Sequence, residues 1–301
     1  MTHEAINLCR EALPDALAFR DAAGRTAAGL AAPGGPVEPV LLDTHQFALH
    51  GYAWMATYVN ALEQLLGWAE RLESDGRFSD LESMILTCGF GAYLKQLKYG
   101  IAMSQDEIVR PGDLGLDESD FFGGAAARKL MKEGDRIAVR QAIAETLRDR
   151  SGEFGDRGLD ETHGMIADQF RRFSDEKVSP HAHGWHVRDE LIPLEIIHEM
   201  AELGVFGLTI PEEDGGLGLG KIAMCVVTEE LSRGYIGVGS LGTRSEIAAE
   251  LIRVNGTPAQ KEKYLGPIGA GEILPTAVFT EPNHGSDLAH IRTRATRDGD
   301  V

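Results

Sequence analysis

The amino-acid sequence predicts a mainly α-helical protein, and three observations support this fold class. Apolar residues recur at three- and four-residue spacing through most of the chain, which is typical of helices that bury one face. Ser, Thr or Asp three residues before Glu or Gln, the capping-box signature of a helix start, occurs repeatedly. Short apolar and alternating runs replace the helical spacing only from residue 273, so strands are expected only there.

The first half of the chain is expected to be helical throughout. Its helical stretches are residues 1–20, 43–76, 79–100 and 125–148. Three capping-box pairs are Asp43 with Gln46, Ser79 with Glu82, and Ser104 with Glu107. Residues 24–39, rich in Ala, Gly and Pro, are expected to be a linker that buries nothing.

A polar stretch punctuated by glycine, residues 150–159, is the expected domain boundary. The helices expected after it are one that carries Ile166, Phe170 and Phe173, one from Pro193 to Gly204, one over 222–231 and one over 242–254. Strand character follows over 274–280 and 291–295, and Asp298-Gly299 signals a hairpin turn after which only two residues remain. We therefore expect the chain to stop inside a β-domain that a parent protein continues.

Composition excludes several classes of function. Lys and Arg number 29 and Asp and Glu number 47, a net charge of −18 that disfavours binding to nucleic acid or to anionic lipid. No apolar run reaches the roughly 18 residues of a membrane span, and no signal peptide opens the chain. Cys9, Cys88 and Cys225 form no CxxC pair, which is typical of reduced thiols in a cytoplasmic protein.

Three motif look-alikes are rejected. GGLGLGKI at 215–222 resembles a phosphate-binding loop, but Ile222 supplies no hydroxyl for Mg²⁺ and three acidic residues precede the loop. The histidines of HAHGWH at 181–186 have no cysteine nearby, so a solvated or capping cluster is favoured over a metal site. His198-Glu199 lacks the second histidine of HExxH. No metal ligand is predicted.

Two blocks of sequence carry a resemblance. The first is GVFGLTIPEEDGGLGLG at 204–220, followed by TEELSR at 228–233. The second is GTPAQKEKYLGPIGAGEIL at 256–274, which leads into TEPNHGSD at 280–287. In order, spacing and residue type they resemble the amino-terminal half of the acyl-CoA dehydrogenase flavoprotein family.

Further segments narrow this resemblance. HGYAW at 50–54, MSQDEIVRP at 103–111 and GTRSEI at 242–247 resemble the branch of the family that acts on (2S)-methylsuccinyl-CoA. The implied architecture is a helical extension over 1–150, an acyl-CoA dehydrogenase-type α-domain over 151–272, and the first strands of a β-barrel domain over 273–301. Homodimers or homotetramers are implied for the full-length protein.

The resemblance also implies a cofactor, FAD, and residues that bind it. These are Ala277, Val278, Phe279, Thr280, Gly285 and Ser286. Main-chain groups near Phe279 and the hydroxyl of Thr280 would contact the isoalloxazine, and Ser286 would lie between flavin and acyl-CoA. His284 departs from the family pattern, which usually has a small residue there.

The implied reaction is α,β-dehydrogenation of an acyl-CoA thioester, here (2S)-methylsuccinyl-CoA to mesaconyl-CoA, with electrons passing to an electron-transfer flavoprotein. The family equally contains oxidases that pass electrons to oxygen, and the sequence does not separate the two. A carboxylate base removes the α-proton while hydride leaves the β-carbon. In the family this base is a Glu from the carboxy-terminal portion, and no residue of this chain matches it. No catalytic base is therefore assigned, and Glu281 in particular is not assigned that role.

Arg244 is a second substrate-binding candidate besides Ser286. In the family its helix lines the acyl pocket, and a dicarboxylic acyl-CoA needs a cation for its free carboxylate. A surface or interdomain salt bridge is the competing interpretation. For the chain as a whole, the alternative to an enzyme is a non-catalytic helical scaffold or an acyl-CoA-binding module.

Overall fold

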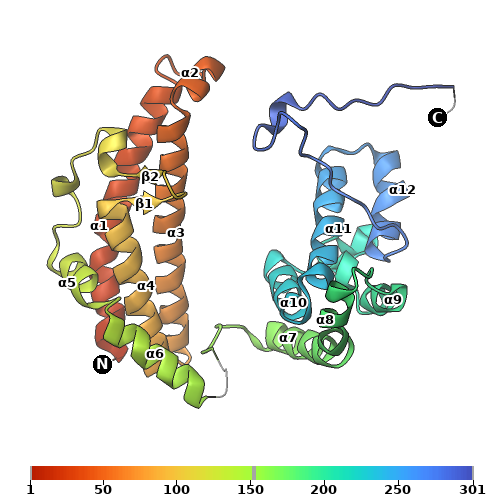
Figure 1. Cartoon of the computed structure of the whole chain (residues 1–301), viewed down its shortest axis with the longest axis horizontal. Helices are drawn as coiled ribbons and strands as arrows, with labels where there is room; N and C mark the ends of the chain where they lie inside the picture. The colour runs from red at the N-terminus through yellow and green to blue at the C-terminus, as the bar shows by residue number, and fades with distance from the viewer. Residues whose placement is uncertain (1, 151–153, 300–301) are drawn as a thin grey trace. The chain divides into compact units, whose positions relative to one another are not determined.

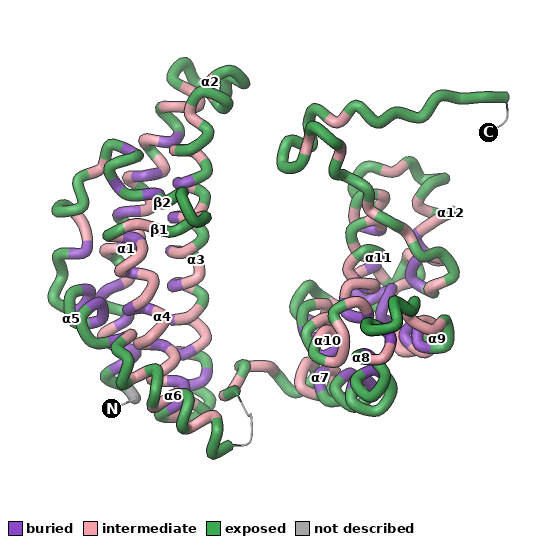
Figure 2. The backbone as a smooth tube through the Cα atoms, in the orientation of Figure 1, coloured by how far each residue is buried: buried purple, intermediate pink, exposed green. Residues whose placement is uncertain are grey.

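The computed structural model describes residues 2–150 and 154–299 (Figure 1). The chain divides into two compact units, Met1–Gly158 and Leu159–Val301. In both units the buried residues follow the inward faces of the helices, and the outward faces are exposed (Figure 2). None of the helices in the described part of the chain combines the length and the apolar content that crossing a bilayer requires.

The first unit is a bundle of long antiparallel helices with one small hairpin. Its helices and strands are α1 (Thr2–Ala31), α2 (Pro39–Thr44), α3 (Gln46–Ser74), α4 (Asp80–Tyr99), β1 (Ile101–Ala102), β2 (Ile108–Val109), α5 (Ala125–Glu133) and α6 (Ile137–Asp149). Helix α1 packs against α3, α4 and α5, and it contributes the fully buried Phe19 to their common core. One apolar core therefore holds the whole bundle together.

The first helix is longer than the sequence predicts. α1 runs through Gly24, so residues 24–31 of the expected linker are helical. Ala23 and Ala27 are buried, and a Cβ added to Gly24 would lie 3.0 Å from the hydroxyl oxygen of Tyr52 on α3. The small side chains let the two helices approach closely, and this packing outweighs the poor helix propensity of glycine.

Two expected helix starts have different outcomes. At α4 the box is confirmed: Ser79 accepts a hydrogen bond from the Leu81 amide, and the Glu82 carboxylate accepts one from the Ser79 amide at 3.0 Å. The expected start at Asp43 is wrong, because this residue lies inside α2 and His45 occupies the N-cap of α3 without a side-chain cap.

The third expected start, Ser104 with Glu107, is also wrong. These residues form the turn between β1 and β2, in which the Met103 amide donates to the Glu107 carbonyl at 2.8 Å. The β-branched Ile101 and Val109, paired across the hairpin, are both fully buried. A strand pair that buries both side chains wins over a local capping signature.

The helix expected over 125–148 is interrupted. α5 ends at Glu133 and α6 begins at Ile137. A Cβ added to Gly134 would lie only 2.3 Å from the Thr87 carbonyl oxygen of α4. The backbone at this break therefore packs directly on the neighbouring helix, which no other residue type permits.

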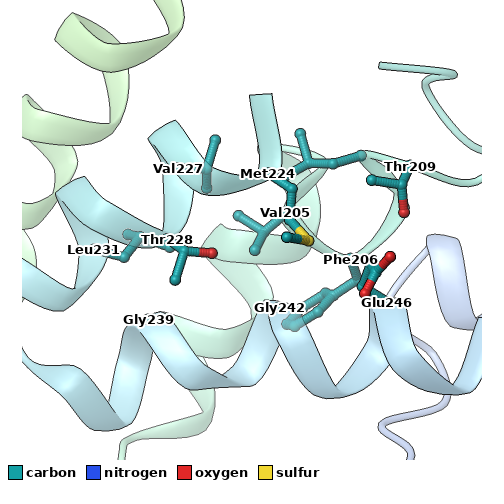
Figure 3. A pocket seen from close by; sticks show the side chains of 11 residues that line it. Val205, Phe206, Thr209, Met224, Val227, Thr228, Leu231, Gly239, Gly242 and Glu246 are labelled. Carbon is teal, nitrogen blue, oxygen red and sulfur yellow. The ribbon is translucent and has the colours of Figure 1, made fainter. Parts of the chain in front are cut away.

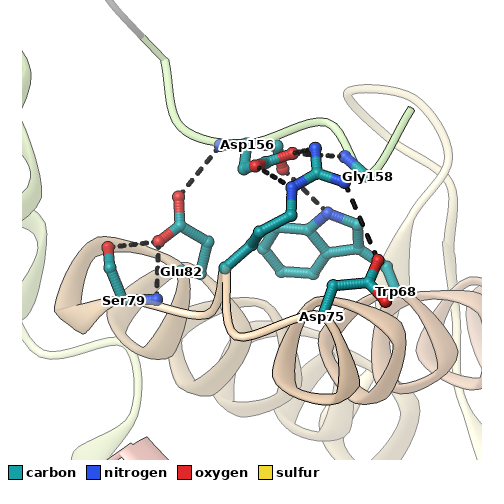
Figure 4. A network of polar contacts seen from close by, with 7 residues as sticks. Trp68, Asp75, Ser79, Glu82, Asp156 and Gly158 are labelled. Atoms are coloured by element: carbon teal, nitrogen blue, oxygen red, sulfur yellow. Dashed lines mark hydrogen bonds and ion pairs between the residues drawn. The ribbon is translucent and has the colours of Figure 1, made fainter. Parts of the chain in front are cut away.

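Residues 154–158 are attached to the bundle by polar contacts (Figure 4). The Asp156 carboxylate accepts two hydrogen bonds from the Arg77 guanidinium, at 2.8 and 2.6 Å. The Asp156 amide donates to the Glu82 carboxylate at 2.9 Å, and its carbonyl accepts from the Trp68 indole. The expected boundary stretch thus contains a segment fixed to the first unit; residues 151–153 of that stretch lie outside the described residues.

The second unit is also helical. Its helices are α7 (Glu161–Phe173), α8 (Ser179–Val187), α9 (Leu194–Glu202), α10 (Lys221–Gly234), α11 (Ile236–Asn255) and α12 (Pro258–Gly269). The four helices that the sequence predicts after residue 159 are confirmed as α7, α9, α10 and α11, although α11 begins six residues early. Arg171 of α7 donates to the nearly fully buried Glu230 of α10 at 2.8 Å, which ties the two helices together.

Residues 273–299 contain no strand in the described structure, where β1 and β2 form the only sheet. The stretch runs as an extended chain with an isolated bridge between Glu281 and His284 and a short 3₁₀ turn, Leu288–His290 (Figure 1). The strands expected over 274–280 and 291–295 are therefore not formed, because a strand requires a hydrogen-bonded neighbour.

Candidate functional site

The expected cofactor-binding residues lie in the extended segment that follows α12. The start of this segment is fixed by Gly271, whose φ of +73° is left-handed and whose added Cβ would lie 2.7 Å from Ala201 Cβ. Further along, Val278 is 80% exposed and Phe279 is 38% exposed. The segment therefore leaves the packed helices at a defined point and then presents apolar side chains to its surroundings.

The polar groups of this segment are available for a ligand. Within the described residues, the main-chain N–H groups of residues 276–280 make no hydrogen bond. The hydroxyls of Thr280 and Ser286 likewise have no partner there, and Gly285 has open space where a side chain would begin. A run of unpaired main-chain donors with two free hydroxyls fits a planar, acceptor-rich group such as an isoalloxazine.

The loop between Thr280 and Ser286 is held by Glu281. Main-chain hydrogen bonds run both ways between Glu281 and His284, at 2.9 and 3.2 Å. The Glu281 carboxylate also accepts hydrogen bonds from the main-chain amides of Arg292 and Thr293. The Thr293 hydroxyl bond, together with these amides, lowers the pKa of Glu281 below its ordinary value.

Arg244 lies on the outward face of α11. Its side chain is exposed, whereas Gly242 and Ser245 beside it are buried. Neighbouring positions on the outward face carry the exposed Ile247 and Leu251. Within residues 2–150 and 154–299 the Arg244 guanidinium makes no hydrogen bond or ion pair, and no contact joins it to Ser286. The helix therefore presents one unpaired cation among apolar side chains.

A small cavity that the sequence did not indicate lies between α10, α11 and residues 205–209 (Figure 3). Its lining residues are Val205, Phe206, Leu208, Thr209, Met224, Val227, Thr228, Leu231, Gly239, Gly242 and Glu246. Glu246 forms an ion pair with Lys221. Arg244 stands about 200° around the helix from Gly242, since each residue turns the helix by about 100°, and so it does not line this cavity.

Glycines bring the walls of this cavity together. A Cβ added to Gly239 would lie 2.0 Å from Ser232 Oγ, and one added to Gly242 would lie 3.0 Å from Val205 Cγ1. The spacing of these two glycines on one helix was the sequence signal that could have located the cavity.

Main-chain amides of the glycine-rich loop over 215–222 are already hydrogen-bonded to carbonyls of the preceding residues. The amides of Gly216, Leu217 and Gly218 donate to carbonyls of Pro211, Gly207 and Ile210, respectively. These N–H groups are therefore turned into the loop and away from any phosphate.

The histidines of 181–186 lie on the surface of α8. His181, His183 and His186 are all exposed. No group of three or more potential metal ligands occurs among the residues that the structure describes.

Comparison with known proteins identifies the second unit. The family described as acyl-CoA dehydrogenase, N-terminal domain, matches residues 160–272, the range that contains α7 to α12. A (2S)-methylsuccinyl-CoA dehydrogenase of Cereibacter sphaeroides is 54% identical over 99% of this chain and 54% of its own length. Residues 160–272 therefore form an acyl-CoA dehydrogenase N-terminal domain.

Other acyl-CoA dehydrogenases match a smaller part of the chain. A mitochondrial isovaleryl-CoA dehydrogenase of Arabidopsis thaliana is 31% identical over 54% of this chain and 41% of its own length. The crystal structure of a glutaryl-CoA dehydrogenase from Mycobacterium smegmatis is 33% identical over 47% of this chain and 37% of that chain, with a TM-score of 0.43.

Two facts about length follow. The chain spans about half the length of the Cereibacter relative and less than half of the Arabidopsis acyl-CoA dehydrogenase. The match to the acyl-CoA dehydrogenase N-terminal domain ends at residue 272, so Arg244 and the cavity lie inside this domain and residues 277–286 lie beyond its end.

Proposed function

We propose that the full-length protein is an FAD-dependent acyl-CoA dehydrogenase that converts (2S)-methylsuccinyl-CoA to mesaconyl-CoA. The observation that carries this proposal is the 54% identity to a (2S)-methylsuccinyl-CoA dehydrogenase over 99% of this chain. That alignment includes the helical first unit, whereas the isovaleryl-CoA dehydrogenase aligns with 54% of the chain. The extension therefore supports the narrower substrate assignment.

The residues after α12 support the assignment of FAD. In this proposal the unpaired main-chain amides near Phe279 and the hydroxyl of Thr280 bind the flavin ring, and Ser286 binds beside it. Gly285 allows the close main-chain approach, since nothing lies where its Cβ would be. When bound, FAD supplies the two-electron acceptor that oxidation of a saturated acyl chain requires.

Arg244 is proposed to bind the free carboxylate of the substrate. A carboxylate removed from water without a partner is costly, and a guanidinium offers two parallel N–H donors to it. The competing salt bridge has no support within the described residues, where the Arg244 side chain is exposed and without a partner. An electron-transfer flavoprotein is proposed as the electron acceptor, and no catalytic base is assigned.

The test is to purify the full-length protein and to follow the visible absorbance of its flavin. We expect yellow protein that (2S)-methylsuccinyl-CoA bleaches under anaerobic conditions, with mesaconyl-CoA as the product. Isovaleryl-CoA, which lacks the free carboxylate, serves as the matched control and should bleach the flavin poorly. Colourless protein that binds no added FAD would contradict the proposal and favour a scaffold or binding module.

A further inference from the structure

The loop from Glu281 to Thr293 has no apolar core of its own. Most of its residues are exposed, and none is buried. What holds its shape is a small set of polar contacts, among which His290 pairs with Asp287 at 2.7 Å. Because no apolar core orders this loop, its conformation depends on these polar contacts.

Glu281 makes the contacts that close this loop. One carboxylate oxygen accepts the Arg292 amide at 3.0 Å and the Thr293 amide at 2.5 Å, and it also accepts the Thr293 hydroxyl. The second oxygen accepts the Arg292 amide at 3.0 Å. These bonds join residues that are eleven and twelve positions apart, so one side chain ties the beginning of the loop to its end.

The position of this closure relates it to the proposed flavin site. Glu281 directly follows Thr280, and its main chain is bridged to His284, two residues before Ser286. The carboxylate therefore holds the main chain between the two hydroxyls that are proposed to bind FAD and its substrate. Movement of Glu281 would shift both hydroxyls relative to each other.

We infer that Glu281 is a positioning residue, which fixes the main chain of Thr280 and Ser286 in the conformation that binds FAD. The inference rests on the proposed function. It assigns Glu281 no proton transfer, because both carboxylate oxygens are already engaged by three donor groups. Those donors stabilise the ionised form, which makes the group a weak base.

The experiment compares four variants with the wild-type full-length protein. Glu281→Ala removes every closing contact, and Glu281→Gln keeps one acceptor oxygen. Thr293→Val removes only the hydroxyl donor. The control is Glu262→Ala on α12, an exposed carboxylate that makes no hydrogen bond or ion pair to any described residue.

Four quantities are measured: the hydrogen exchange at the Arg292 and Thr293 amides, the dissociation constant of FAD, the absorption spectrum of the bound flavin, and the melting temperature of the apoprotein. In Glu281→Ala we expect exchange at both amides to be faster by roughly tenfold or more, and FAD binding to be weaker by about tenfold. The flavin spectrum should shift, while the melting temperature stays at the wild-type value. In amide exchange and FAD affinity, Glu281→Gln should lie between Glu281→Ala and the wild type. Thr293→Val should be close to the wild type, and Glu262→Ala should equal it.

Two results would overturn the inference. If Glu281→Ala keeps the FAD affinity and flavin spectrum of the wild type despite faster amide exchange, the contacts of Glu281 hold the loop but do not affect FAD binding. Unchanged exchange at Arg292 and Thr293 would show that the carboxylate does not close the loop. In both cases the wild-type protein still binds FAD and the proposed function stands, whereas a wild-type protein that binds no FAD overturns both.

Discussion

The indole nitrogen of Trp68 donates a hydrogen bond to the carbonyl oxygen of Asp156 at 2.9 Å, across 88 residues of chain (Figure 4). With the contacts from Arg77 and Glu82, it makes the segment that leaves the first unit part of that unit's fold. The attachment of this segment can be tested separately from the proposed chemistry.

Trp68→Phe tests this attachment. The substitution removes the N–H donor and keeps most of the ring. We therefore expect the free energy of unfolding to fall by about 0.5–1.5 kcal/mol and amide exchange over 154–158 to be faster. Trp54→Phe is the control, because the Trp54 indole donates to His50 on its own helix. If both variants exchange alike over 154–158, the indole does not hold the segment.

Glu82 predicts a response to acid. Burial acts to raise the pKa of this carboxyl, but hydrogen bonds from Ser79 and the Asp156 amide outweigh it and lower the pKa. Because the folded pKa lies below the unfolded value, the unfolded state binds more protons, and stability present above about pH 4.5 is lost as pH falls through the folded pKa. Glu82→Gln should lower stability at neutral pH by about 1.5–3 kcal/mol and flatten this acid dependence. Urea titrations between neutral and acidic pH measure both; an unchanged acid slope in the variant would contradict the assignment.

Arg244→Ala tests the proposed carboxylate contact. Loss of a charged hydrogen bond of about 1.5–3 kcal/mol should raise KM for (2S)-methylsuccinyl-CoA by about 10- to 150-fold, and KM for a monocarboxylic acyl-CoA little. Arg253→Ala is the matched control, since Arg253 lies on the same helix and pairs with Glu250 at 2.8 Å. Steady-state kinetics with both substrates decide the matter, and equal effects of Arg244→Ala on the two KM values refute the contact.

Gly239→Ala tests the packing between α10 and α11. Its Cβ would lie 2.8 Å from the Ser232 amide nitrogen, a main-chain atom that cannot move alone, so we expect destabilisation by about 1–3 kcal/mol. Gly164→Ala on α7 is the control, because nothing lies within 4 Å of its added Cβ and alanine favours the helix by about 0.4–1 kcal/mol. Thermal melting should therefore shift in opposite directions for the two variants.

The sequence predicts those parts of the fold that depend on neighbouring residues. The Ser79 and Glu82 box is confirmed because all its partners lie within one helical turn. The same signature at Ser104 and Glu107 fails because Val109 gains more from burial in a hairpin. Capping signatures describe what a segment can do locally, and distant packing decides between the possibilities.

The candidate site divides in the same way. The N–H groups near Thr280 lie in the segment that the sequence singles out for FAD, and that assignment stays a prediction, whereas the closure by Glu281 was not predictable from residue types. Its main partners are main-chain amides, which every residue except proline carries, so the sequence gives no sign of which ones are bound.

The packing of α1 has a consequence for synthesis on the ribosome. This helix emerges before the rest of the first unit, yet its partners include α5, and Glu4 pairs with Lys129, which is made 125 residues later. The contacts at Asp156 are completed later still. The first unit therefore finishes folding only when its last residues have emerged. During that delay the alanine-rich face of α1, which is buried in the folded unit, is exposed to solvent and to chaperones.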